Sequence, residues 1–156
     1  MTAYYGAQIC LNGHVISSYD CNEPKFCPKC GAETISNCPN CNSSIRGKAN
    51  MTGIVDCTPY TPPNYCADCG KPYPWMKSKL ESIQELIEFN DKLSDDEKNY
   101  MANNLTSLTV DTPKTKVTAT KFKQYLHEVG QSTAESFREI LVDVLSETAK
   151  KIIFPQ

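Results

Sequence analysis

The second half of the chain carries apolar residues at helical spacing. A first helix is predicted after Trp75 and extends to about Asn90. One of its faces carries the apolar residues Met76, Leu80, Ile83, Leu86 and Ile87. Glutamates occupy its other faces, as in an amphipathic helix that packs on one side and meets water on the other. The pattern therefore predicts that a helical region follows Trp75.

Two further helices are indicated by the residues at their starts. Ser94 and Glu97 have the spacing of a capping box, in which each side chain bonds a backbone amide of the other residue. Thr112 and Pro113 provide a helix cap and a first-turn proline for the next helix. Gly130 is expected to end that helix.

A last helix is predicted from a long apolar stripe with an acidic ridge beside it. The stripe consists of Phe137, Ile140, Leu141, Val144, Leu145 and Ile152. Packing in a helical core is its simplest interpretation. Self-association through this helix is the alternative, and binding to a membrane surface is disfavoured because the polar face is acidic.

The first half has a different composition. All nine cysteines and eight of the ten prolines lie at or before Trp75, whereas residues 76–156 hold no cysteine. This shift predicts two domains, a cysteine-rich one over residues 1–75 and a helical one over residues 76–156.

Segments that would direct the chain to or through a membrane are not apparent. The first ten residues lack a basic start and a sustained apolar stretch, and no run approaches the roughly 18 apolar residues of a bilayer span. We therefore expect a cytoplasmic protein. In a reducing compartment, closely spaced cysteines indicate metal binding or redox chemistry rather than disulfides.

Three cysteine pairs have the two-residue spacing of metal-binding turns: Cys27 with Cys30, Cys38 with Cys41, and Cys66 with Cys69. A fourth pair consists of Cys10 and His14. Zinc favours four thiolate or imidazole ligands in a tetrahedron, and each pair provides two of them from one loop. A single pair of this kind is also typical of redox sites, but four pairs together favour zinc.

Pairing the turns in chain order gives two zinc ions with complete ligand sets. The sets are Cys10, His14, Cys27 and Cys30 for the first ion, and Cys38, Cys41, Cys66 and Cys69 for the second. An interleaved cross-brace is the alternative. Sequential pairing is preferred because residues 15–16 and 45–55 resemble strands within each loop, which indicates tandem zinc ribbons of short β-hairpins.

The fourth ligand of the first site has two candidates, His14 and Cys21. His14 lies behind a turn-forming Asn12-Gly13 pair, four residues after Cys10. Cys21 is its competitor for the fourth position of the first site. Cys57 is a further spare thiol, which we interpret as part of the ribbon wall.

Charge weakens the case for a nucleic-acid partner. Residues 1–75 contain five basic and five acidic side chains, and seven thiolates holding two Zn²⁺ would leave this half near −3. Residues 76–111 are also acidic. The one basic cluster is Lys114, Lys116, Lys121 and Lys123, for which solvated surface is the simpler interpretation and an anion or RNA contact the alternative.

The chain resembles an uncharacterised bacterial double zinc-ribbon family, domain of unknown function 2321. The resemblance is carried by the cysteine turns, by Arg46-Gly47, and by the stretches Thr61–Cys66 and Cys69–Trp75. The resemblance covers nearly the full chain. It implies the double-ribbon fold and a bacterial, intracellular setting, but no activity.

A small metal-bound α+β protein is thus predicted, with tandem zinc ribbons followed by three to four helices. We expect a protein-interaction or scaffold module, with Tyr65, Tyr73 and Trp75 as partner anchors or, alternatively, as residues that seat the ribbons on the first helix. Nucleic-acid binding is the second hypothesis. Catalysis ranks third, because general bases are scarce and four ligands close each zinc.

Overall fold

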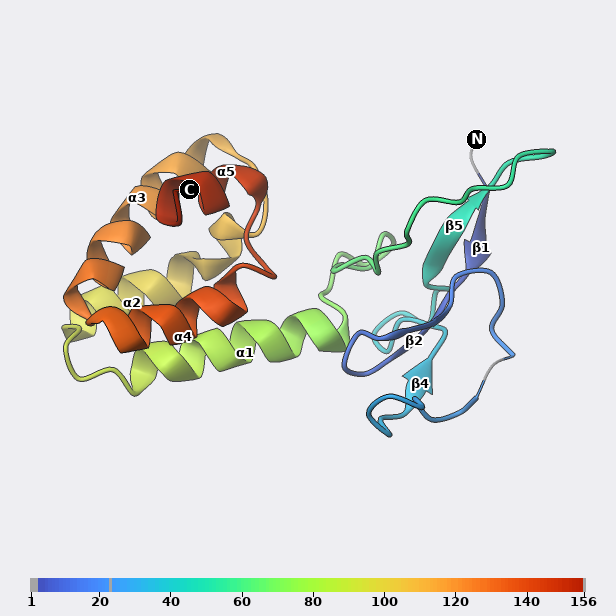
Figure 1. The fold of residues 1–156 in the computed structure, drawn as a ribbon, viewed down its shortest axis with the longest axis horizontal. Helices are drawn as coiled ribbons and strands as arrows, with labels where there is room; N and C mark the ends of the chain where they lie inside the picture. The colour runs from blue at the N-terminus through green and yellow to red at the C-terminus, as the bar shows by residue number, and fades with distance from the viewer. Residues whose placement is uncertain (1–2, 23, 156) are drawn as a thin grey trace. The chain divides into compact units, whose positions relative to one another are not determined.

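The computed structural model describes residues 3–22 and 24–155 (Figure 1). The chain forms two compact units, Met1–Lys77 and Ser78–Gln156. Over the described residues, none of the helices combines the length and apolar character that crossing a bilayer requires. The first unit holds the strands and the second is helical, which confirms the predicted α+β class with short antiparallel hairpins.

The described part of the first unit contains five short strands. They are β1 (Ala3–Gly6), β2 (Gln8–Cys10), β3 (Val15–Ser17), β4 (Thr34–Ile35) and β5 (Arg46–Asn50). In one sheet β2 lies between β3 and β4, and all pairs are antiparallel. In the other sheet β1 pairs with β5, so that Tyr4 lies opposite Ala49.

The pairing of β1 with β5 links the two predicted ribbons. β1 precedes the first cysteine, whereas β5 follows the Cys38–Cys41 pair. Strand pairing was expected only within each ribbon, whereas the β1–β5 sheet joins a strand of the first ribbon to a strand of the second. The close approach depends on Gly47, because a β-carbon there would lie 2.9 Å from the carbonyl oxygen of Tyr5 in β1 and 2.2 Å from that of Ser18, which follows β3.

The segment predicted as strand over residues 45–55 is strand only in its first part. After Asn50 the chain turns, and the amide of Ile54 donates to the carbonyl of Met51 at 3.2 Å. Gly53 adopts a left-handed backbone with φ of +76°. Residues 51–55 therefore form a loop, because the turn removes them from the β1–β5 pairing.

The second unit is built from five α-helices over the described residues, one more than the upper end of the predicted range. They are α1 (Pro74–Glu88), which begins in the first unit, α2 (Asp95–Asn104), α3 (Pro113–Glu128), α4 (Gln131–Leu141) and α5 (Glu147–Ile153), with a 3₁₀ turn η1 (Leu105–Leu108). Helix α3 contacts α2, η1, α4 and α5. Its Phe122 is fully buried, and the helix forms the centre of the unit.

The helix starts are those predicted. Ser94 caps α2, and its amide bonds the Glu97 carboxylate at 2.8 Å while its hydroxyl accepts from the Glu97 amide at 3.2 Å. Thr112 precedes α3, and its amide donates to the Thr115 hydroxyl at 2.8 Å. Gly130 lies between α3 and α4 with φ of +87°.

The prediction of a single last helix was wrong, because the structure divides this segment into α4 and α5. After Leu141 the backbone leaves the α-helix through a turn. Ser146 then caps α5, because its hydroxyl accepts a hydrogen bond from the Ala149 amide at 3.3 Å. The Ser146 amide donates to the carbonyl of Leu108 at 2.8 Å, a tertiary contact that no periodicity reveals. Four residues of the predicted stripe are buried and belong to the core, whereas Ile140 and Ile152 are half-buried; the buried four are Phe137, Leu141, Val144 and Leu145.

Candidate metal centres

The three two-residue-spaced cysteine pairs share one backbone turn. In the first, the Cys27 amide donates to the carbonyl of Ala32, and the Gly31 amide donates back to the carbonyl of Cys27, both at 2.8 Å. The turns at Cys38 and Cys66 repeat both bonds at 2.8–2.9 Å. Short antiparallel bridges flank all three turns.

The residue after the second cysteine has a left-handed backbone in each turn. Gly31, Asn42 and Gly70 have φ of +73°, +62° and +72°. Glycine adopts this conformation without strain, and asparagine tolerates it better than most residues. The sequence Cys-x-x-Cys-Gly or Cys-x-x-Cys-Asn thus brings two sulfur atoms to the same side of one loop.

The structure brings Cys10, His14, Cys27 and Cys30 together, and we call this group the first tetrad. Cys10 ends β2 and His14 precedes β3, so both side chains lie at the turn of one hairpin. The Sγ atoms of Cys10 and Cys30 are 3.8 Å apart. His14 Nδ1 lies 3.4 Å from the sulfur of Cys10 and 3.6 Å from that of Cys27.

Cys38, Cys41, Cys66 and Cys69 form the second tetrad. The Sγ atoms of Cys38 and Cys69 are 3.7 Å apart, and those of Cys41 and Cys66 are 3.6 Å apart. The two groups follow chain order rather than a cross-brace. All eight predicted ligands belong to one tetrad or the other.

The separations within both tetrads fit a tetrahedral metal ion. With metal–sulfur bonds of about 2.3 Å and metal–nitrogen bonds of about 2.0 Å, tetrahedral angles require S···S distances of roughly 3.8 Å and S···N distances of roughly 3.5 Å. A disulfide would need its sulfur atoms about 2.05 Å apart. The ligand atoms of each tetrad lie within 4.8 Å of one another, so that one ion can contact all four.

Hydrogen-bond donors around the sulfur atoms favour the thiolate form that metal binding needs. The backbone amide of Ala32, helped by the Asn12 side chain 3.3 Å away, lowers the pKa of Cys30 to about 6. In the second tetrad the hydroxyl of Ser43, 3.3 Å from Cys66 Sγ, lowers the pKa of Cys66 to about 5. Ser43 and Asn12 were missed by the sequence analysis, because their roles depend on loop geometry.

Burial acts in the opposite direction on the inner thiols. It raises the pKa of Cys38 to about 11 and raises that of Cys10 as well. The three thiols of the first tetrad and the four of the second are too closely spaced for all of them to ionise without a cation to balance their charge. A divalent ion would therefore displace protons from both tetrads, which makes metal binding weaker in acid.

Cys21 and Cys57 lie outside both tetrads. Both thiols are exposed, and Cys21 Sγ lies 4.0 Å from the carbonyl oxygen of Ala7. The structure thus groups His14, rather than Cys21, with the cysteines of the first tetrad.

Replacing His14 by alanine should accordingly release one metal ion per chain, whereas Cys21→Ser should keep both. The reason is that alanine leaves three ligands, and the fourth position opens to solvent. His14→Cys should restore the second ion, because a thiolate can take the same position. Metal analysis of the three purified variants tests this, and loss of metal from Cys21→Ser instead would transfer the ligand role to Cys21.

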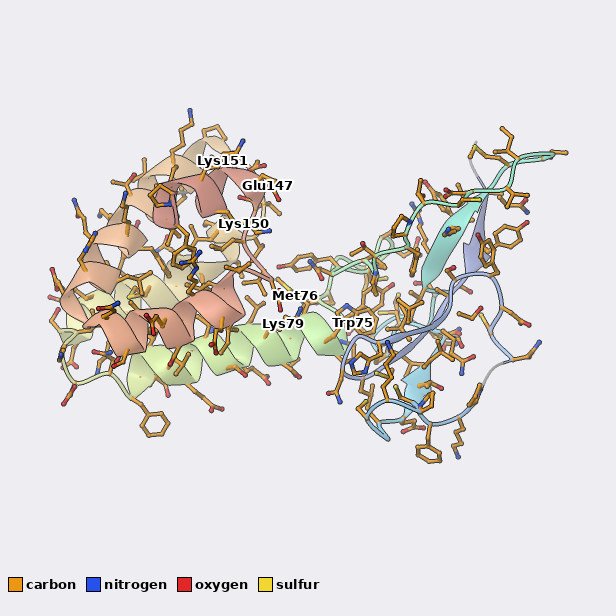
Figure 2. The ribbon with its side chains drawn as sticks, viewed as in Figure 1. Trp75, Met76, Lys79, Glu147, Lys150 and Lys151 are labelled. Atoms are coloured by element: carbon orange, nitrogen blue, oxygen red, sulfur yellow. The ribbon has the colours of Figure 1, made fainter. Side chains whose placement is uncertain are left out.

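Two of the three proposed partner anchors are buried. Tyr73 and Trp75 are 2% and 4% exposed, and their rings stack with centroids 4.9 Å apart. Trp75, at the start of α1 (Figure 2), donates from its indole nitrogen to the carbonyl of Pro63 at 3.1 Å and packs against Gly13. The structure does not present these two side chains to a partner, and Tyr65 is half-buried.

Trp75 and Tyr73 instead support the tetrads. Trp75 contacts the Asn12-Gly13 turn that separates Cys10 from His14. Tyr73 hydrogen-bonds Cys66, and burial raises the pKa of its phenol above the usual range. The aromatic pair therefore touches the first tetrad's hairpin and a ligand of the second tetrad.

The family comparison covers nearly the whole chain. The sequence model of a family described as "uncharacterized protein conserved in bacteria (DUF2321)" matches residues 3–153. No curated protein and no solved structure matches the chain.

Proposed function

The chain belongs to the bacterial family DUF2321, and we propose that it is a zinc-stabilised scaffold that binds a protein partner rather than catalysing a reaction. One observation carries the proposal: each tetrad offers four protein ligands to one ion. A structural zinc site is closed in this way, whereas a catalytic zinc keeps one position for water or substrate. The same proposal places the protein in the cytoplasm, where thiols stay reduced.

Zinc is the metal that best suits both ligand sets. Tetrahedral sites of four thiolates, or of three thiolates and an imidazole, are typical of structural zinc. Four thiolates also suit iron, but the imidazole of His14 in the first tetrad favours zinc for the pair of sites. Bound zinc would hold the loops of the first unit in place, because these loops have few strands to fix them.

The histidines give little support to catalysis. His14 belongs to the first tetrad, and His127 is exposed in the last turn of α3. General acid–base catalysis needs a positioned proton-transfer group beside a substrate site. We propose on these grounds that the protein is not an enzyme.

A nucleic-acid partner is the second candidate, supported by exposed lysines on α3. Lys114, Lys116 and Lys121 are exposed, and α3 has no acidic residue in its first turn. The formal charge of the chain is −2, however, and metal-bound thiolates make the first unit more negative. Binding to random DNA or RNA at physiological salt should therefore be no tighter than the roughly 10⁻⁴ to 10⁻⁶ M of non-specific complexes.

Affinity capture from native bacterial lysate tests the protein-partner proposal. The metal-loaded chain should retain a defined protein, and both a chelator and Cys69→Ser should abolish its retention, because they disorder the first unit. Cys57→Ser is the matched control and should retain the same protein. Retention that survives chelation, or steeply salt-dependent submicromolar binding of RNA that requires the three lysines, would contradict the proposal.

A further inference from the structure

The loop that follows β5 has an apolar tip formed by Met51, Ile54 and Val55. These side chains are 44%, 63% and 84% exposed. Among the described residues the last β1–β5 pair is Ala3 with Asn50, and the loop with the Gly53 turn projects past these paired strands (Figure 1). Single exposed apolar residues are ordinary, but three within five positions mark a contact surface.

Tyrosines lie directly behind the apolar tip. Tyr4 is opposite Ala49 on the β1–β5 ribbon and is 47% exposed. Tyr19 is 49% exposed, and its hydroxyl donates to the carbonyl of Asp56, the residue after the tip, at 3.1 Å. The ring of Tyr5 contacts that of Tyr19 edge-on, with centroids 5.3 Å apart.

Two cations lie beside these tyrosines. The Arg46 guanidinium lies 5.0 Å from the Tyr4 ring centroid, and the Lys48 ammonium lies 5.5 Å from that of Tyr19. Lys48 also donates to the carbonyls of Asp56 and Thr58, which fixes its position at the base of the loop. The Asp56 carboxylate accepts from the amide and hydroxyl of Thr58 at 2.9 and 2.6 Å.

We propose that this tip inserts into the surface of an anionic lipid bilayer. Along the β1–β5 ribbon Tyr4 lies opposite Ala49 and Arg46 lies opposite Gly6, so the order inward from the tip is aliphatic, then tyrosine, then arginine. A membrane interface has the same order, because acyl chains meet aliphatic groups, tyrosine rings lie at headgroup level, and lipid phosphates attract cations. Apolar groups of peripheral proteins reach about 5–10 Å into this boundary.

The layered order is what favours a bilayer over a protein groove. A groove in a partner would require apolar contacts but not cations set back behind them along one axis. A second copy of the chain packed tip to tip would bring the Arg46 side chains of both copies to the same surface, where like charges repel. The inference goes beyond the protein-partner proposal and does not depend on its outcome.

Sedimentation with lipid vesicles tests the inference on the full, metal-loaded chain. The protein should bind vesicles of equal phosphatidylglycerol and phosphatidylcholine, and about fivefold more weakly to phosphatidylcholine alone, because the Asp56 carboxylate offsets the charge of Lys48 and leaves Arg46 as the net positive charge behind the tip. The double variant Ile54→Asp/Val55→Asp should bind at least tenfold more weakly than the native chain while keeping its metal. Phe89→Asp is the matched control, because Phe89 is an 86% exposed apolar residue of the second unit, and it should bind normally.

A fluorescent probe locates the loop directly. Trp75 is the single tryptophan and is 4% exposed, so the emission of a Val55→Trp variant reports the tip against a constant background. Vesicles should shift that emission to the blue, and brominated acyl chains should quench it. The inference would be overturned if the native chain failed to bind anionic vesicles, or if the double variant bound them as well as the native chain. It would also be overturned if the chain dimerised without lipid and the double variant abolished the dimer.

Discussion

A Cys69→Ser chain should keep one metal ion instead of two and should lose the folded structure around the second tetrad. Binding of a structural zinc contributes about 10–16 kcal/mol in zinc-finger peptides, which is comparable to or larger than the whole stability of a typical domain. Three remaining thiols cannot close the tetrahedron. Elemental analysis gives the metal count, and heteronuclear NMR shows which amides lose their dispersion.

Cys57→Ser is the matched control for this variant. Cys57 is an exposed thiol in the same first unit and belongs to neither tetrad. It should retain two ions and native spectra. Two ions in the Cys69→Ser chain would remove Cys69 from the ligand set, and metal loss from Cys57→Ser would show that the tetrads are assigned incorrectly.

Gly47→Ala should have the second large effect, although position 47 contacts no metal ligand. Its β-carbon would lie 2.2 Å from the Ser18 carbonyl oxygen and 2.9 Å from that of Tyr5. Both neighbours are backbone atoms, so β1 and β5 must separate, and the bond from the Lys48 amide to Ser18 lengthens. We expect the free energy of unfolding to fall by about 3 kcal/mol and metal to be released faster to a chromogenic chelator.

Gly53→Ala separates steric overlap from the general cost of replacing glycine. Gly53 has φ of +76°, but a β-carbon there meets no atom within 4 Å. The left-handed conformation alone should lower the free energy of unfolding by about 1–2 kcal/mol. Metal release should change little, because the loop lies outside both sheets. Equal metal-release rates for the two variants would contradict the role given to the β1–β5 pairing.

The parts of the fold that local chemistry determines could be predicted from the sequence. Each cysteine turn follows from its spacing and from a residue that accepts positive φ, as at Gly31 and Asn42. The starts of α2 and α3 follow from Ser94 and Thr112, whose bonds lie within three residues of the cap. Such features depend on near neighbours in the chain.

The features that were missed depend on contacts between distant segments. The break between α4 and α5 is fixed by a bond from Ser146 to Leu108, and β1 finds its partner more than forty residues later in β5. For Trp75 the sequence left two interpretations open, a partner anchor or a residue that seats the ribbons, and the Gly13 turn and the carbonyl of Pro63 bury it. Composition gives no sign of these contacts.

The metal content of the native chain tests the central claim most directly. Native mass spectrometry with elemental analysis, on protein purified without added metal, should give two zinc ions per chain. The two tetrads require this stoichiometry, because each provides four ligand atoms within 4.8 Å of one another. A single ion per chain, or iron accompanied by visible absorption, would contradict the account.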